Sequence, residues 1–96
     1  MLLHDRSFGS VIRQRRIELG LTQANVALEL AIRNINFVDM IETGKRSCPL
    51  DHVPRLANVL RLDQLDLCML ALHEEYPRFY AGIFGDGKPP RPRPTK

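Results

Sequence analysis

Between Arg33 and Arg46 the chain carries a run of side chains suited to contacts with nucleic-acid bases. An asparagine such as Asn36 can bind adenine through N6 and N7 together, and the carboxylate of Asp39 can accept a hydrogen bond from cytosine N4. Basic residues follow at once, and Lys45 and Arg46 suit contacts with phosphate. This order of amides, a carboxylate and cations favours recognition of a DNA major groove.

Catalytic chemistry has much weaker support in this sequence. The three histidines, His4, His52 and His73, fall in three different predicted elements. No Gly-rich phosphate loop, HExxH motif or GxSxG motif occurs. Glu74 and Glu75 beside His73 are interpreted as a charged helix end. We therefore expect no enzyme activity and no cofactor.

The two cysteines give no metal-binding pattern. Cys48 and Cys68 are twenty residues apart and lack a histidine pair at metal-ligand spacing. We expect two reduced, partly buried thiols and no metal, and a redox switch is the alternative.

Two short helices joined by a turn, at about residues 22–44, would have to position the polar side chains. Thr22 and Asn34 are good N-cap residues for these helices, and Gly44 can end the second one. The apolar residues at helical spacing are Val26, Ala27, Leu30, Val38 and Ile41. A short helix with an apolar back and a polar front suits insertion into a major groove.

The motifs LGLTQ, VA and IETGKR, in this order, resemble the signature of the Cro/repressor-type helix-turn-helix proteins, the XRE family. The resemblance covers about residues 8–64 and implies an all-α, five-helix, lambda-repressor-like DNA-binding domain. It also implies that Gln23 contacts DNA, at a phosphate or at a base edge. An ion pair between Arg16 and Glu42 is implied as well.

One departure from the family lies between Leu30 and Glu42, where this chain has eleven residues and the family usually has ten. The extra residue is expected at residues 32–34, as in a subgroup with a longer turn. The residues expected to contact DNA are Gln23, Arg33, Asn34, Asn36, Phe37, Asp39, Lys45 and Arg46. For Phe37 the alternative is that its ring packs beneath the longer turn.

The remaining helices are predicted from their cap residues. Ser7 can cap the first helix, and Asp51 can cap a fourth helix with Pro54 in its first turn. Asp63 can cap a fifth helix over residues 64–76, which Pro77 would end.

Residues 65–84 carry more apolar side chains than one core-facing stripe needs. We expect this segment, a helix and the aromatic stretch PRFYAGIF, to form a homodimer interface. The interface residues would be Leu67, Leu70, Ala71, Tyr76, Phe79, Tyr80 and Phe84. The alternative is that the aromatic residues fold back onto their own monomer.

Composition places the chain among small globular domains, with 96 residues, 44% of them hydrophobic and 26% charged. No apolar run reaches the roughly 18 residues of a transmembrane helix, and MLLHDRSF lacks the apolar core of a secretory signal. We therefore expect a cytoplasmic protein that does not associate with a membrane.

Charge is divided unevenly along the chain. Residues 1–46 carry seven basic residues against five acidic, residues 47–84 three against five, and residues 85–96 four against one. The last segment is Pro-rich, has no apolar anchor and is expected to be disordered. This polarity fits one end that meets phosphate and another that meets protein.

The sequence therefore predicts a DNA-binding core over residues 1–64, a dimerisation segment over residues 65–84 and a tail over residues 85–96. The expected function is that of a transcriptional regulator that binds double-stranded DNA sequence-specifically. Most simply it would be a homodimeric repressor on a pseudo-palindromic operator, acting also on its own gene. The alternatives are an antitoxin or adaptor that binds a protein partner through the C-terminal apolar surface, and a restriction–modification controller.

Overall fold

A computed structural model describes residues 7–95, and within this range the regular elements are helices. The expected all-α fold is confirmed. His4 lies outside the described residues. The helices are α1 (Phe8–Glu18), α2 (Gln23–Glu29), α3 (Ile35–Glu42), the 3₁₀ turn η1 (Leu50–His52), α4 (Val53–Val59), α5 (Gln64–Glu75) and α6 (Pro77–Phe84). No helix in the described range is both long enough and apolar enough to cross a bilayer.

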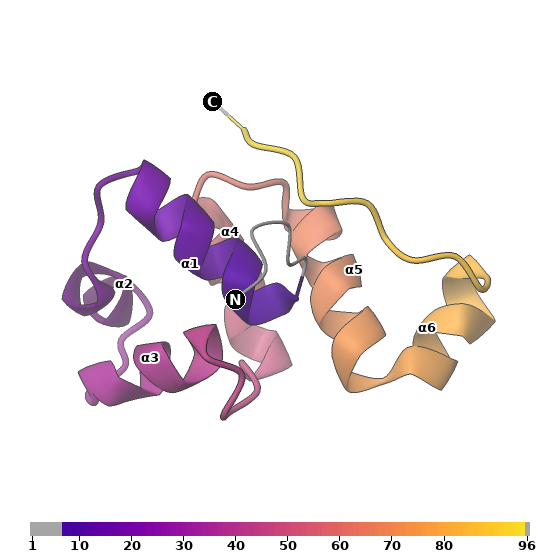
Figure 1. The fold of residues 1–96 in the computed structure, drawn as a ribbon, viewed down its shortest axis with the longest axis horizontal. Helices are drawn as coiled ribbons and strands as arrows, with labels where there is room; N and C mark the ends of the chain where they lie inside the picture. Colours follow the sequence, from indigo (N-terminus) through magenta and orange to yellow (C-terminus); the bar gives the residue numbers. More distant parts are fainter. Residues whose placement is uncertain (1–6, 96) are drawn as a thin grey trace.

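The first five α-helices enclose one core. α4 packs on α5, α2 on α3, and α1 contacts both α3 and α5. The largest fully buried side chains come from three of these helices and the turn after α4: Val38, Val53, Leu56, Leu60 and Leu67. In Figure 1, α2 and α3 lie at one end of the molecule and α6 lies at the other, beyond α5.

Four of the predicted helix caps are confirmed: Ser7, Thr22, Asn34 and Asp63. Each side-chain oxygen accepts a hydrogen bond from a backbone N–H in the first turn, where the helix itself supplies no acceptor. The predicted cap at Asp51 is wrong. Helical backbone already begins in η1, where His52 N–H donates to Pro49 O at 2.9 Å, so Asp51 lies inside a turn that continues into α4.

The segment after α5 forms a helix of its own, so the described chain has six α-helices and not five. Pro77 ends α5 because it cannot continue the hydrogen-bond ladder, and Glu75 is the last residue of that helix. Proline is well suited to a first helical position, where an N–H would have no partner, and α6 begins at Pro77 itself.

The tail packs on the body of the protein, which corrects the expectation of disorder. Asp63 N–H donates to Arg93 O at 2.8 Å, and Thr95 N–H donates to Arg61 O at 2.7 Å. These bonds flank an isolated antiparallel bridge between residues 62 and 94. Figure 1 shows the tail running from the end of α6 back past α5.

Two features of the tail supply the anchors that its composition appeared to lack. Pro89 and Pro92 are buried, so proline rings take the place of aliphatic side chains. The Arg93 guanidinium donates to both carboxylate oxygens of Asp66, at 2.8 and 3.2 Å, and the Asp66 carboxylate is buried. These hydrogen bonds lower the pKa of Asp66 below its ordinary value of 3.8.

We expect Arg93→Gln to lower the free energy of unfolding at neutral pH and to make this loss pH-dependent. Because the pKa of Asp66 is lowered in the folded state, the pair's contribution is complete above 3.8 and disappears as the pH falls through the lowered pKa. Urea unfolding at a series of pH values measures the difference between the variant and the wild type. Arg91→Gln is the matched control, because Arg91 is an exposed arginine of the same tail. A difference for Arg93→Gln that stays constant down to about pH 2 would contradict this account.

Candidate nucleic-acid interface

Residues 30–34 connect α2 to α3 and set the angle between them. Ala31 adopts a left-handed conformation with φ of 57°, which is uncommon for a residue with a side chain. This turn lets Ile32 N–H donate to Ala27 O at 2.8 Å, and Ile32 then packs against the core. Residues 30–34 therefore form an irregular turn between the two helices.

The buried carboxylate of Glu42, at the end of α3, connects α3 to α1 and α2. Glu42, whose side chain is only 1% exposed, accepts hydrogen bonds from Arg16 Nε at 2.6 Å and from Arg16 Nη2 at 3.1 Å. This is the ion pair that the resemblance implies. Gln23 Nε2 donates a third hydrogen bond to Glu42, at 3.1 Å. Charge-assisted bonds of this kind are short and directional, so α1 and α2 together fix the position of α3.

Gln23 has a second partner on α3. Its Nε2 also donates to Asp39 Oδ1 at 3.1 Å, so the amide lies between two carboxylates. Arg16 Nη1 donates to Leu21 O at 2.9 Å and thereby holds the link between α1 and α2. The start of α2 is consequently tied to α3 by side chains and to α1 through the arginine.

The outward face of α3 lies opposite its buried residues. Val38 and Ile41 are buried, whereas Asn36 and Thr43 are exposed and Met40 is half-buried between them. These three outward positions follow the helical spacing i, i+4 and i+7. The sequence reasoning selected Asn36 and missed Thr43, although the same spacing counted from Asn36 points to it. A threonine methyl group can contact the methyl group of thymine.

Two of the residues expected to contact DNA have structural roles. Asn34 Oδ1 accepts the Asn36 N–H at 2.9 Å as the cap of α3, so one acceptor position of this oxygen is already used within the protein. Phe37 is half-buried and packs against the core, which supports the alternative for its ring. Arg33, in the turn before α3, is exposed.

Two cations are held close to the C-terminal end of α3. The N–H groups of Lys45 and Arg46 both donate to Met40 O, at 2.8 and 3.2 Å, and Gly44 permits this tight reversal with φ of 80°. Both basic residues are exposed. With Arg33 before the helix, exposed cations therefore lie near both ends of α3.

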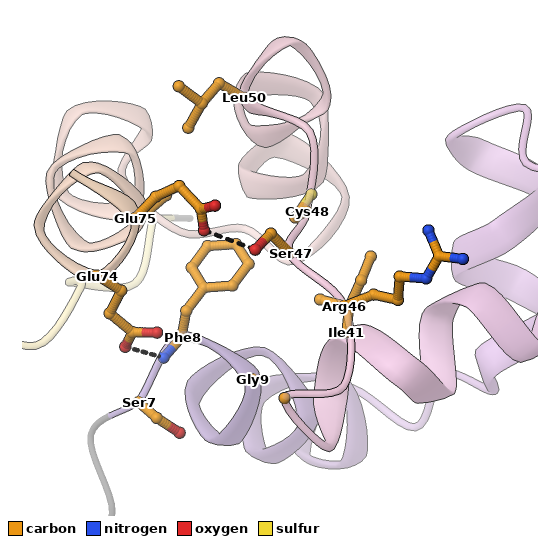
Figure 2. Close-up of a pocket in the computed structure, with 12 residues that line it drawn as sticks. Ser7, Phe8, Gly9, Ile41, Arg46, Ser47, Cys48, Leu50, Glu74 and Glu75 are labelled. Atoms are coloured by element: carbon orange, nitrogen blue, oxygen red, sulfur yellow. Dashed lines mark hydrogen bonds between the residues drawn. The ribbon is translucent and has the colours of Figure 1, made fainter.

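A small pocket of about 120 Å³ separates the loop after α3 from α1 and the end of α5. Ser47 Oγ donates to Glu75 Oε2 at 2.6 Å, and Phe8 N–H donates to Glu74. Figure 2 shows both contacts, and it shows the Arg46 side chain pointing away from the pocket. Burial raises the pKa of the nearby Cys48 thiol to about 11. The pocket walls thus anchor the loop and leave its cation facing outward.

The predicted dimerisation residues separate into two groups. Four of them are buried within the chain's own fold, which corrects their assignment to an interface: Leu67, Leu70, Ala71 and Tyr80. The ring of Tyr80 contacts those of His73 and Phe84, with centroids 4.9 and 4.8 Å away. The other three, Tyr76, Phe79 and Phe84, remain exposed. Ile83, which was not among the predicted residues, is exposed as well, and these four side chains around α6 are called the α6 patch here.

No family model matches the chain, and no curated protein or solved structure matches it either. The case for a function therefore rests on the geometry described above.

α1 approaches the end of α3 so closely that only glycine fits at residue 9. A Cβ atom there would lie 2.5 Å from both Ile41 O and Glu42 O, which are backbone atoms and cannot rotate away. We expect Gly9→Ala to lower the free energy of unfolding by about 1–3 kcal/mol, the usual cost of overpacking. Urea unfolding measures the loss.

Gly82→Ala is the matched control, because Gly82 is also helical and a Cβ atom there meets nothing within 4 Å. There the higher helix propensity of alanine should stabilise by up to about 1 kcal/mol. A Gly9→Ala variant that gains stability as Gly82→Ala does would show that α1 and α3 are not in this contact.

Proposed function

We propose that the protein is a transcriptional regulator that binds double-stranded DNA sequence-specifically and inserts α3 into the major groove. One observation carries this proposal: the Glu42 network fixes a short helix whose outward face presents Asn36, with exposed cations near its two ends. A fixed polar helix of this size matches the dimensions of the major groove. The proposal assigns no enzyme activity and no cofactor to the protein.

The division of labour among the side chains follows from their chemistry. Asn36 is exposed, and no side-chain hydrogen bond ties its amide to the rest of the described chain, so both its donor and its acceptor are free for adenine. Arg33, Lys45 and Arg46 are exposed cations that neutralise phosphates and release counterions. Base contacts would provide specificity, and phosphate contacts would provide most of the affinity.

The α6 patch supports a homodimer. Phe79 is 62% exposed and Ile83 is 55% exposed, and they lie four residues apart on one side of α6. Water contact with several large apolar side chains in one place is unfavourable unless a partner covers them. A second copy would add a second α3, in a major groove one helical turn away, about 34 Å, or a multiple of it. Such a dimer would repress transcription by occupying a pseudo-palindromic operator, its own included.

The same patch supports a second candidate function. A different protein could cover Phe79 and Ile83, as expected of an antitoxin or an adaptor. The oligomeric state of the purified protein separates the two candidates. A homodimeric regulator should be a dimer on its own, whereas covering of the patch by a different protein requires that partner to be present.

Asn36→Ala and Arg46→Ala are expected to weaken DNA binding in different ways. Loss of the Asn36 amide should cost about 1–3 kcal/mol at the preferred sequence and relax the preference at one or two base pairs. Loss of the Arg46 cation should weaken binding to all sequences and reduce the slope of log K against log salt by about 0.9. Titrations of selected and unrelated duplexes at several salt concentrations measure both effects.

Arg78→Ala is the control for charge, because Arg78 is an exposed arginine on α6, at the other end of the molecule. It should leave the salt slope unchanged. If Asn36→Ala and Arg46→Ala both weaken all sequences equally, the proposed division into base and phosphate contacts is wrong.

Phe79→Glu is expected to convert the dimer into a monomer, because a carboxylate would be buried in an apolar interface. Light-scattering mass measures the change. Leu65→Glu is a matched control, since Leu65 is 61% exposed against 62% for Phe79 but lies near the start of α5. A wild-type monomer, or a dimer that survives Phe79→Glu, would contradict dimerisation through the α6 patch.

A further inference from the structure

The amide of Gln23 can have only one orientation. Its two neighbours, Asp39 Oδ1 and Glu42 Oε1, are carboxylate oxygens at 3.1 Å, and ionised carboxylates only accept hydrogen bonds. The NH₂ group must therefore face both of them, and each of its two hydrogens is used. A reversed amide would place its oxygen against two carboxylates.

Gln23 and Asp39 together offer a ligand only hydrogen-bond acceptors. Gln23 keeps its Oε1, and Asp39 keeps Oδ2, to which no described residue donates. Both residues are half-buried, so part of each side chain remains accessible. Asp39 lies one turn after Asn36 in α3, beside the outward face described above.

Turning the amide around to form a donor would be unfavourable. Glu42 is buried and depends on Gln23 for one of its three hydrogen bonds, and the other two come from Arg16. A buried charge that loses a partner is destabilised. The acceptor-only arrangement is thus maintained from behind by the same network that holds α3.

These acceptors are incompatible with phosphate. Phosphate oxygens carry negative charge and only accept, and the Asp39 carboxylate repels them. In the major groove, the hydrogen-bond donors on base edges are the amino groups N4 of cytosine and N6 of adenine, whereas guanine O6 and thymine O4 accept.

We propose that Gln23 and Asp39 act together as a specificity element that selects an amino-bearing base, cytosine or adenine, and rejects guanine and thymine at that position. Gln23 is then a base-edge acceptor and not a phosphate ligand. This inference rests on the proposed DNA-binding function and states which base chemistry the surface takes. Discrimination at this position should be about tenfold to a hundredfold, the range of one well-made base contact.

Asp39→Asn tests this assignment by inverting the chemistry at constant shape. The single oxygen of the new amide would accept from Gln23, whose orientation Glu42 still fixes, and its NH₂ would face outward as a donor. Selection from a random double-stranded library should give cytosine or adenine at one position of each half-site with the wild type. With Asp39→Asn the preference at that position should change to guanine or thymine.

Asp86→Asn is the matched control, because it removes the same charge from the exposed turn that follows α6, at the far end of the molecule from α3. It should leave the selected sequence unchanged. An Asp39→Asn variant that keeps the wild-type preference would overturn the assignment.

A second measurement changes the DNA, so its main comparison uses the wild-type protein and does not depend on the folding of a variant. In the selected duplex, the cytosine is replaced by 2-pyrimidinone, or the adenine by purine, each of which lacks only the amino group. Wild-type affinity should fall about tenfold or more, and Asp39→Ala should be insensitive to the replacement. Equal wild-type affinity for the two duplexes would overturn the inference while leaving DNA binding intact. A wild type that selects no sequence would overturn the proposed function itself.

Discussion

The buried carboxylate of Glu42 is the constraint on which the arrangement of α1, α2 and α3 depends. A carboxylate that is 1% exposed is tolerable only with strong partners, and Arg16 and Gln23 supply three hydrogen bonds from two other helices. Removing one member of such a buried pair costs about 3–5 kcal/mol, because the other charge is left unpaired. The absence of a side chain at Gly9 allows α1 to approach the same end of α3. The orientation of α3 is therefore set by charge and close backbone contact together.

This constraint explains how a chain of 96 residues could hold the eight-residue helix α3, the proposed recognition helix, in a fixed position. An isolated helix of that length is unstable in water, so its position must come from tertiary contacts. Val38 and Ile41 supply the apolar part of those contacts, and Glu42 supplies the directional part. The side chains on the outward face of α3 are therefore held in place before any ligand binds. The α6 patch lies at the opposite end of the molecule, so a partner could cover it without covering α3.

Much of the fold could be predicted from sequence because caps and apolar spacing are local signals. Thr22, Asn34 and Asp63 act as caps because a cap needs only a hydroxyl, amide or carboxylate oxygen next to a helix start. The docking of the tail could not be predicted, because it depends on Asp66 being buried beside a distant Arg93. Apolar spacing alone also could not separate buried from exposed positions in α5, where Leu67, predicted at the interface, is buried and Leu65 is exposed. The shared amide of Gln23 likewise requires the angle between α2 and α3, which a sequence pattern does not contain.

The most direct test of the central claim is to map the amide chemical shifts of the protein during two titrations. One titration uses a duplex that the protein has selected from a random library, and the other uses an unrelated duplex. The account predicts that the selected duplex shifts the signals of the first turn of α2, of α3 and of residues 45–46. The signals of α6 should keep their positions and show only the line broadening of a larger complex. The unrelated duplex should shift mainly the signals of the basic residues, because phosphate contacts do not depend on sequence. Shifts confined to α6, or no shifts with either duplex, would contradict the assignment of α3 as a DNA-recognition helix.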